Sequence, residues 1–173
     1  MPSGRTHDSI TFLLAVPAGF LIWRFSGSVS LAIIGALAFV FGGLMFGPDL
    51  DTSSVQYGRW GLFKIIWVPY KMFFKHRSFW THGLIFGTLL RILYFLGMIT
   101  VLAVGVFIIA GFAGYGAPLK SFEFTSNWSD IGNYLRHVFG PYVLYTVFAG
   151  LWLGAASHSF SDWALSYIKT GKP

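Results

Sequence analysis

Residues 83–112 read GLIFGTLLRILYFLGMITVLAVGVFIIAGF, and this apolar stretch decides the fold class. As one α-helix these 30 residues would be roughly 45 Å long, which exceeds the roughly 30 Å hydrocarbon core of a bilayer. No turn signal interrupts the stretch between Leu84 and Ile109, so one long membrane helix is expected rather than two short ones. Arg91 lies in its first turns, where the side chain can snorkel to the interface or pair with acidic residues.

The composition of the whole chain is that of a membrane protein. Of its 173 residues, 55% are hydrophobic and 10% are charged, whereas a soluble domain is about 25% charged. We expect an integral protein of a plasma or thylakoid-type membrane, with residues 1–173 as a single domain. The net charge of +6 indicates loops that face anionic membrane lipid, and no motif points to nucleic acid. A second copy of the chain and a membrane complex both remain open as partners.

Three further apolar runs complete an all-α polytopic helical bundle of about four transmembrane helices; they cover residues 10–25, 28–46 and 138–156. Pro17 is expected to kink the first of these helices. The second run carries small residues that permit close contact between helices, among them Gly35, Gly42 and Gly43.

The segments that join these spans differ in character. Residues 48–82 mix basic and aromatic side chains, which suits an amphipathic helix in the interface plane, broken in its middle by Pro69. Residues 111–137 are expected to form a polar loop, and the last span should continue as a helix to Ile168.

The basic residues predict the orientation of the chain. Four spans put both termini on one side, and that side receives eight basic residues: Arg5, Arg59, Lys64, Lys71, Lys75, Arg77, Lys169 and Lys172. The other side receives Arg24, Lys120 and Arg136. Because loops rich in Lys and Arg stay in the cytoplasm, both termini are predicted to be cytoplasmic.

Histidines and aspartates gather at the ends of the expected spans. Eight of them fall on the same side of the four-span arrangement: His7, Asp8, Asp49, Asp51, His76, His82, His158 and Asp162. Ionisable groups beside apolar helix ends are costly unless they are paired, hydrated or bound to metal. Convergence from four distant stretches therefore predicts a metal site.

The local spacings fit metal chemistry. His158 and Asp162 are four apart and share one face of a helix, and an extended Asp49-Leu50-Asp51 would point both carboxylates the same way. The chain has no cysteine, so His and Asp ligands favour Zn²⁺, Mn²⁺ or Fe²⁺. Six to eight candidate ligands are enough for a dinuclear site.

Each pair also has an ordinary structural explanation. Asp8 is a candidate helix cap, and Asp49 and Asp51 are common turn residues. His76 lies in a basic run that suits lipid headgroups, and Thr81-His82 suits a helix cap. His158 and Asp162 suit a weak ion pair on a helix surface.

Four short motifs carry a family resemblance: GRTHD at residues 4–8, PDLD at 48–51, HRSFWTH at 76–82 and SHSFSD at 157–162. Together they resemble the membrane-bound, metal-dependent hydrolase family typified by the LexA-regulated inner-membrane protein. The full length is similar to a related family of metal-binding membrane proteins common in cyanobacteria, especially in MPSGRTHD at the start and FGGLMFGPDLD at 41–51. The third motif departs from the common His-Arg-Gly-x-Thr-His form, because Ser78 replaces the glycine and Trp80 is an extra residue.

The resemblance implies a metal-dependent hydrolase at the cytoplasmic membrane face. In a hydrolase of this kind, a bound divalent metal ion lowers the pKa of a coordinated water and polarises the scissile group. The expected ligands are Asp49, His82, His158 and Asp162 first, with His7, Asp51 and His76 completing a second site or the outer shell. Asp8 is the expected general base, and Lys75 and Arg77 would hold the phosphate of a phosphoester or lipid-like substrate.

Two other functions compete with hydrolysis. A non-enzymatic metal-binding subunit of a membrane complex would hold the ion in a closed site, whereas hydrolysis needs an open coordination position. A metal transporter is disfavoured, because transport sites lie near the midplane of the bilayer and these residues lie at one edge.

Overall fold

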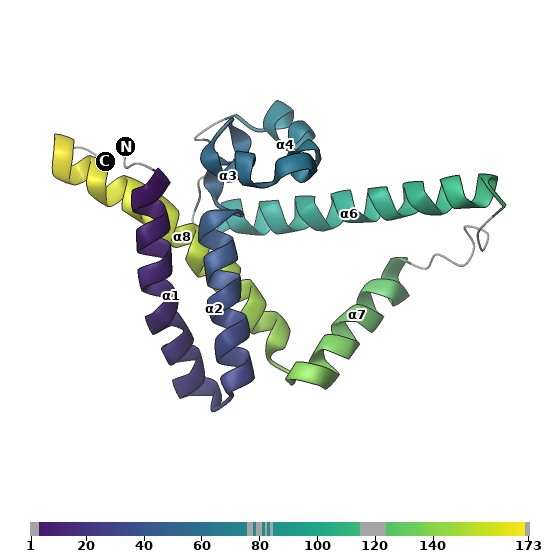
Figure 1. Cartoon of the computed structure of the whole chain (residues 1–173), viewed down its shortest axis with the longest axis horizontal. Helices are drawn as coiled ribbons and strands as arrows, with labels where there is room; N and C mark the ends of the chain where they lie inside the picture. Colours follow the sequence, from purple (N-terminus) through teal and green to yellow (C-terminus); the bar gives the residue numbers. More distant parts are fainter. Residues whose placement is uncertain are drawn as a thin grey trace.

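The computed structural model describes residues 4–75, 78, 81, 83, 85–114 and 124–171, and every regular element in these ranges is a helix. The elements follow one another along the chain (Figure 1): α1 Gly4–Ser26, α2 Val29–Leu44, η1 Pro48–Asp51, α3 Val55–Arg59, η2 Gly61–Trp67, α4 Val68–Phe73, α6 Phe86–Phe112, α7 Phe124–Phe139 and α8 Val143–Thr170. The predicted all-α class is confirmed for this part of the chain.

Helices α1, α2 and α8 pack against one another, with α2 and α8 in the most extensive contact (Figure 1). Glycines make this contact close. A Cβ atom on Gly150 would lie 2.6 Å from the carbonyl oxygen of Gly35, and one on Gly42 would lie 2.9 Å from the Cα atom of Leu151. The prediction that Gly35 and Gly42 permit close helix packing is therefore confirmed.

Helix α1 begins earlier than predicted. The apolar run suggested a start near Ile10, but the helix begins at Gly4 and continues through Pro17. His7, Thr11 and Ala15 are buried and recur every four residues, so they form one stripe on the helix. Tertiary packing of this stripe accounts for the extra turns, and it places His7 inside the helix rather than before it.

Helix α6 is a single helix over Phe86–Phe112, as the absence of a turn signal predicted. With α1 and the Val143–Ala164 part of α8, it is one of three described helices long and apolar enough to cross a membrane, whereas α2 is shorter. Figure 1 shows α6 extending away from the end of α2 instead of lying alongside α1 and α2. The buried residues of α6, Gly87, Thr88 and Arg91, all lie near its start, and the predicted bundle of about four transmembrane helices is not confirmed.

The segment after α2 is not one interfacial helix, which corrects the prediction for residues 48–82. Its described part folds as four short helices, η1, α3, η2 and α4, and the break between η2 and α4 falls just before Pro69, which lies in the first turn of α4. Proline is tolerated there because its missing N–H would have no partner within the helix. Trp67 and Tyr70 are fully buried in an aromatic cluster, where Trp67 stacks on Phe95 of α6 at 5.8 Å between centroids.

The predicted polar loop at residues 111–137 is also wrong in part. Residues 115–123 lie outside the described ranges, but α7 occupies 124–139 and α8 starts at Val143 instead of Val138. Trp128, Ile131, Leu135 and Val138 recur at helical spacing, while polar residues fill the other side. The many polar residues concealed an amphipathic helix. Helix α8 then continues without a break to Thr170, in agreement with the prediction of one long helix.

Arg91 does not snorkel to an interface. Its side chain is 2% exposed, and its guanidinium donates from Nη1 to the carbonyl oxygen of Thr81 at 2.7 Å and from Nη2 to Thr88 Oγ1 at 3.0 Å. These bonds tie the start of α6 to the residues just before it, next to the helices η1 and α4.

Candidate metal centre

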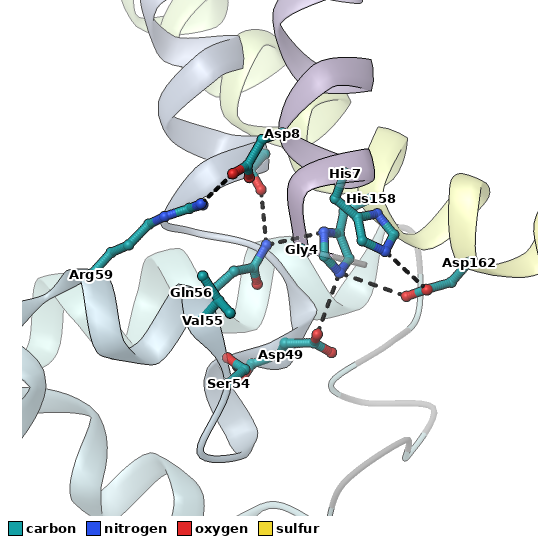
Figure 2. A pocket seen from close by; sticks show the side chains of 11 residues that line it. Gly4, His7, Asp8, Asp49, Ser54, Val55, Gln56, Arg59, His158 and Asp162 are labelled. Atoms are coloured by element: carbon teal, nitrogen blue, oxygen red, sulfur yellow. Dashed lines mark hydrogen bonds and ion pairs between the residues drawn. The ribbon is translucent and has the colours of Figure 1, made fainter. Parts of the chain in front are cut away.

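A pocket of about 230 Å³ lies where the start of α1, the end of α2, the turn η1, helix α3 and the second half of α8 meet (Figure 2). Its lining includes four of the charged or histidine residues predicted for the site, together with Asp8. The full lining is Gly4, His7, Asp8, Gly43, Asp49, Ser54, Val55, Gln56, Arg59, His158 and Asp162. The residues on α1 and α8 come from opposite ends of the chain.

His7, His158 and Asp162 form the centre of this pocket. The Nε2 atom of His7 lies 3.2 Å from Oδ1 of Asp162, and Nε2 of His158 lies 3.6 Å from Oδ2 of the same carboxylate. Both imidazole rings are buried and stack on each other, with centroids 3.9 Å apart and planes inclined by 21°. One carboxylate therefore faces two ring nitrogens, as Figure 2 shows.

Ser161 determines which nitrogen of His7 carries the proton. Its Oγ lies 2.8 Å from the backbone oxygen of His158 and 2.8 Å from Nδ1 of His7. A carbonyl oxygen only accepts, so the single hydroxyl proton goes to it, and Ser161 accepts from the Nδ1–H of His7. The Nε2 atom of a neutral His7 then presents its lone pair to Asp162. Two acceptors 3.2 Å apart require a proton or a cation between them.

A divalent ion fits this arrangement. A tetrahedral zinc ion with ligand bonds of about 2.0–2.1 Å would hold its donor atoms roughly 3.3 Å apart. The spacings between the ring nitrogens and Asp162 are 3.2 and 3.6 Å, and one donor atom from each of the three residues lies within 4.8 Å of the others. The buried Nε2 of His158 has no hydrogen-bond partner in the part of the chain that is described. His and carboxylate donors suit zinc, manganese or iron.

Gln56 orients His158 from the other side. Its amide nitrogen donates to the carbonyl oxygen of Gly43 at 2.8 Å and lies 3.2 Å from Nδ1 of His158. A histidine that binds metal through Nε2 carries its proton on Nδ1 and donates it to an acceptor. Within the described residues, Gln56 Oε1 is buried and accepts no hydrogen bond, so rotation of the amide would bring an acceptor to His158.

The two aspartates of the PDLD motif separate, which corrects the prediction that they point the same way. The motif is a 3₁₀ turn instead of an extended strand, and positions two apart on such a helix diverge. Asp49 Oδ2 lies 3.4 Å from His158 Nε2, whereas the buried Asp51 is not part of the pocket lining. Ser54 Oγ donates to the backbone oxygen of Asp49 at 2.8 Å and fixes the turn.

Asp8 lies in the pocket but outside the group of His7, His158 and Asp162. Its Oδ2 forms an ion pair with Nη2 of Arg59 at 2.5 Å, and Arg59 also donates to the backbone oxygen of Leu44 at 2.8 Å. The negative charge of Asp8 is thus neutralised by the guanidinium of Arg59, which α3 holds in the pocket wall.

The remaining predicted site residues, His76, His82 and Arg77, lie outside the described residues, and Lys75 is exposed at the end of α4. The sequence pattern did not reveal three residues of the site, Ser161, Gln56 and Arg59. Ser161 could have been found, because it stands three residues after His158 and one before Asp162 on the same helix.

Comparison with known proteins supports a metal-binding role for the chain. A family model described as uncharacterized metal-binding protein (DUF2227) matches residues 2–172. No curated protein and no solved structure matches. The chain therefore belongs to this family of metal-binding proteins.

Proposed function

We propose that the chain is a membrane-bound, metal-dependent hydrolase whose centre is His7, His158 and Asp162. The observation that carries this proposal is the combination of three candidate ligands with an adjoining pocket of about 230 Å³. Catalytic zinc sites typically use three protein ligands and keep a fourth position for water or substrate, whereas structural sites are closed. A bound divalent ion would polarise the scissile group and activate a water as nucleophile.

Residues around the ion would supply the other catalytic roles. Asp8 is the proposed general base, and Arg59 holds its carboxylate at the pocket wall through their ion pair. Asp49 stands beside His158, where it would orient the nucleophilic water. Ser161 sets the proton position of His7, and the Gln56 amide holds the ring of His158 from its Nδ1 side.

The proposed substrate is a phosphoester or a lipid-like molecule at the cytoplasmic membrane face. This part rests on three apolar helices long enough to span a bilayer, on Arg59 in the pocket lining, and on the further basic residues of the same segment, among them Lys75. The proposed relation to the LexA-regulated hydrolase family rests on the four motifs alone.

A structural metal site in a membrane complex is the second candidate. The position of Asp49 favours it, since a carboxylate 3.4 Å from His158 Nε2 would give a fourth protein ligand and close the site. In that case removal of the ion would lower the stability of the α1–α8 contact without removing an activity.

The test measures metal content and activity in one set of variants. Wild-type protein and the variants His158→Ala, Asp162→Ala and Asp49→Ala are purified, and metal per chain is determined by elemental analysis. Hydrolysis of phosphoesters and lipids is measured with and without a chelator. His137→Ala and Asp130→Ala on α7 are matched controls, because both side chains are exposed and neither lines the pocket.

The two candidates give different results. A hydrolase should hold about one ion per centre, lose it in His158→Ala and Asp162→Ala, and lose activity with the chelator. A closed structural site should also lose metal in Asp49→Ala and show no chelator-sensitive hydrolysis. Wild-type protein without metal, or full metal content in both His158→Ala and Asp162→Ala, would refute both candidates.

A further inference from the structure

The outer side of η2 and α4 exposes an unusual number of large apolar side chains. Leu62 is 93% exposed and Phe73 is 81% exposed, although both belong to regular helices. We call the following five residues the outer face: Leu62, Phe63, Ile65, Met72 and Phe73. A cluster of exposed apolar groups of this kind marks a surface that meets a membrane or another molecule.

The inner side of the same two helices is anchored in the protein. Ile66, Trp67 and Tyr70 are buried, and Trp67 packs against both Trp60 and Phe95. The hydroxyl of Tyr94 on α6 donates to the backbone oxygen of Ile66. The outer face is therefore held rigidly in its exposed position, and turning it inward would require removal of the aromatic cluster.

Basic side chains accompany the outer face, and η2 and α4 themselves carry no acidic side chain. Lys64 and Lys75 are exposed within or next to the two helices. The sequence contains no aspartate or glutamate between Asp51 and Glu123. Lys71 lies 4.1 Å above the ring of Tyr57 and donates to Ser53 Oγ, so its charge stays on this segment.

We propose that the outer face docks onto an anionic lipid bilayer, with Leu62 and Phe73 among the acyl chains and Lys64 and Lys75 at the headgroups. Helices of seven and six residues cannot span a bilayer, but an apolar face flanked by lysines suits its interface. A symmetric contact with a second copy fits less well, because it would bring lysines together with no acidic side chain from this segment between them.

Docking of the outer face would also place the metal pocket near the membrane surface. Helix α3, which lines the pocket with Val55, Gln56 and Arg59, is separated from η2 only by Trp60. A bilayer bound to the outer face would therefore hold the pocket a short distance from the headgroups. The inference rests on the membrane placement in the proposed function, but it does not depend on the metal.

Single-cysteine labelling tests the docking, because the chain has no cysteine of its own. Leu62→Cys and Phe73→Cys are labelled with a fluorophore and reconstituted into phosphatidylcholine nanodiscs with brominated acyl chains, with or without phosphatidylglycerol. Val55→Cys is the matched control, since Val55 is 59% exposed but lines the pocket. Quenching by the brominated chains should be severalfold stronger at Leu62 and Phe73 than at Val55.

The lysines supply the second arm of the experiment. In the Phe73→Cys background, Lys64→Glu and Lys75→Glu should lower quenching in discs with phosphatidylglycerol and leave it unchanged in neutral discs. Equal quenching in both kinds of disc would overturn the anionic preference. Absence of quenching, with disulfide cross-links between Phe73→Cys copies, would assign the face to a second copy instead. Metal content is also measured on the Phe73→Cys samples. Normal metal content without quenching would reject the docking and leave the proposed metal site intact, whereas quenching without metal would do the reverse.

Discussion

The imidazole rings of His7 and His158 stack at 3.9 Å between centroids, although they come from the first and the last helix of the chain. Two imidazolium rings at this distance in a buried site would repel each other strongly. The pair is therefore suited to share one cation near Asp162 instead of carrying two protons. This contact joins the two ends of the chain at the candidate metal centre.

Ser161→Ala should weaken metal binding without removing a ligand. The substitution takes away the acceptor of the His7 Nδ1–H, so the ring loses the bond that fixes its tautomer. Loss of such an outer hydrogen bond typically costs about 10- to 100-fold in metal affinity. Titration with zinc and a competing chelator measures the change. Ser159→Ala on the same helix is the control, and equal affinity in the two variants would contradict the role of Ser161.

Gln56→Leu and Gln56→Glu should differ in metal affinity. With a metal on Nε2, His158 carries its proton on Nδ1, and leucine removes the Gln56 amide whose oxygen would accept that proton after rotation, so affinity should fall by about 10- to 100-fold. Glutamate offers a carboxylate oxygen to the same Nδ1–H and should retain most of the affinity, despite losing the bond to Gly43. The same chelator competition applies. If both variants lose affinity equally, Gln56 acts on Gly43 and not on His158.

Asp49→Asn and Asp51→Asn should have separate effects. Asp49 faces His158, so its substitution should change metal affinity or activity. Asp51 is 5% exposed and outside the pocket lining, so Asp51→Asn should leave the metal affinity unchanged and lower the thermal stability. Both quantities are measured on each variant. A loss of metal in Asp51→Asn at unchanged stability would restore Asp51 as a ligand.

The sequence predicted much of the candidate site because its strongest signals are local. His158 and Asp162 share a helix face whatever the rest of the fold does, and they form the expected pair at 3.6 Å. The orientation of Asp51 depends on the local backbone. In a strand Asp49 and Asp51 would point the same way, whereas in the observed 3₁₀ turn they diverge. Gln56 carries no local signal, since its role arises only when α3 packs against α2 and α8.

The fold was predictable where one side chain type decides the contact. Gly35 and Gly42 indicated close packing of α2, and on the partner helix α8 the residues at this contact are Gly150 and Gly154. The direction of α6 was not predictable, because a helix that is apolar on all sides has no pattern that selects a neighbour. Helix α7 was missed because its composition is polar, although its apolar residues follow the helical period.

Gly150→Ala should destabilise the packing of α2 and α8. The added Cβ would lie 2.6 Å from the oxygen of Gly35 and 2.7 Å from the Cβ of Ala38, so the helices must separate. Overpacking of this kind typically costs about 1–3 kcal/mol. Gly97→Ala on α6 is the matched control, because a Cβ added there would meet no neighbouring side chain or helix within 4 Å. Thermal unfolding in detergent should show a lower Tm for Gly150→Ala only.

The burial of the Tyr70 phenol predicts a loss of folding stability at high pH. Burial raises the pKa of Tyr70 from 10.0 to about 12, although the positive charge of Arg91 opposes this change. The folded state thus favours the neutral phenol. Its contribution is complete below the unfolded pKa of about 10 and is lost as the pH rises towards 12, by at most about 3 kcal/mol for two pKa units. Thermal unfolding is followed by circular dichroism across this range. Tyr70→Phe cannot ionise, so its Tm should fall less than that of the wild type, and an identical fall in both proteins would assign the effect to other groups.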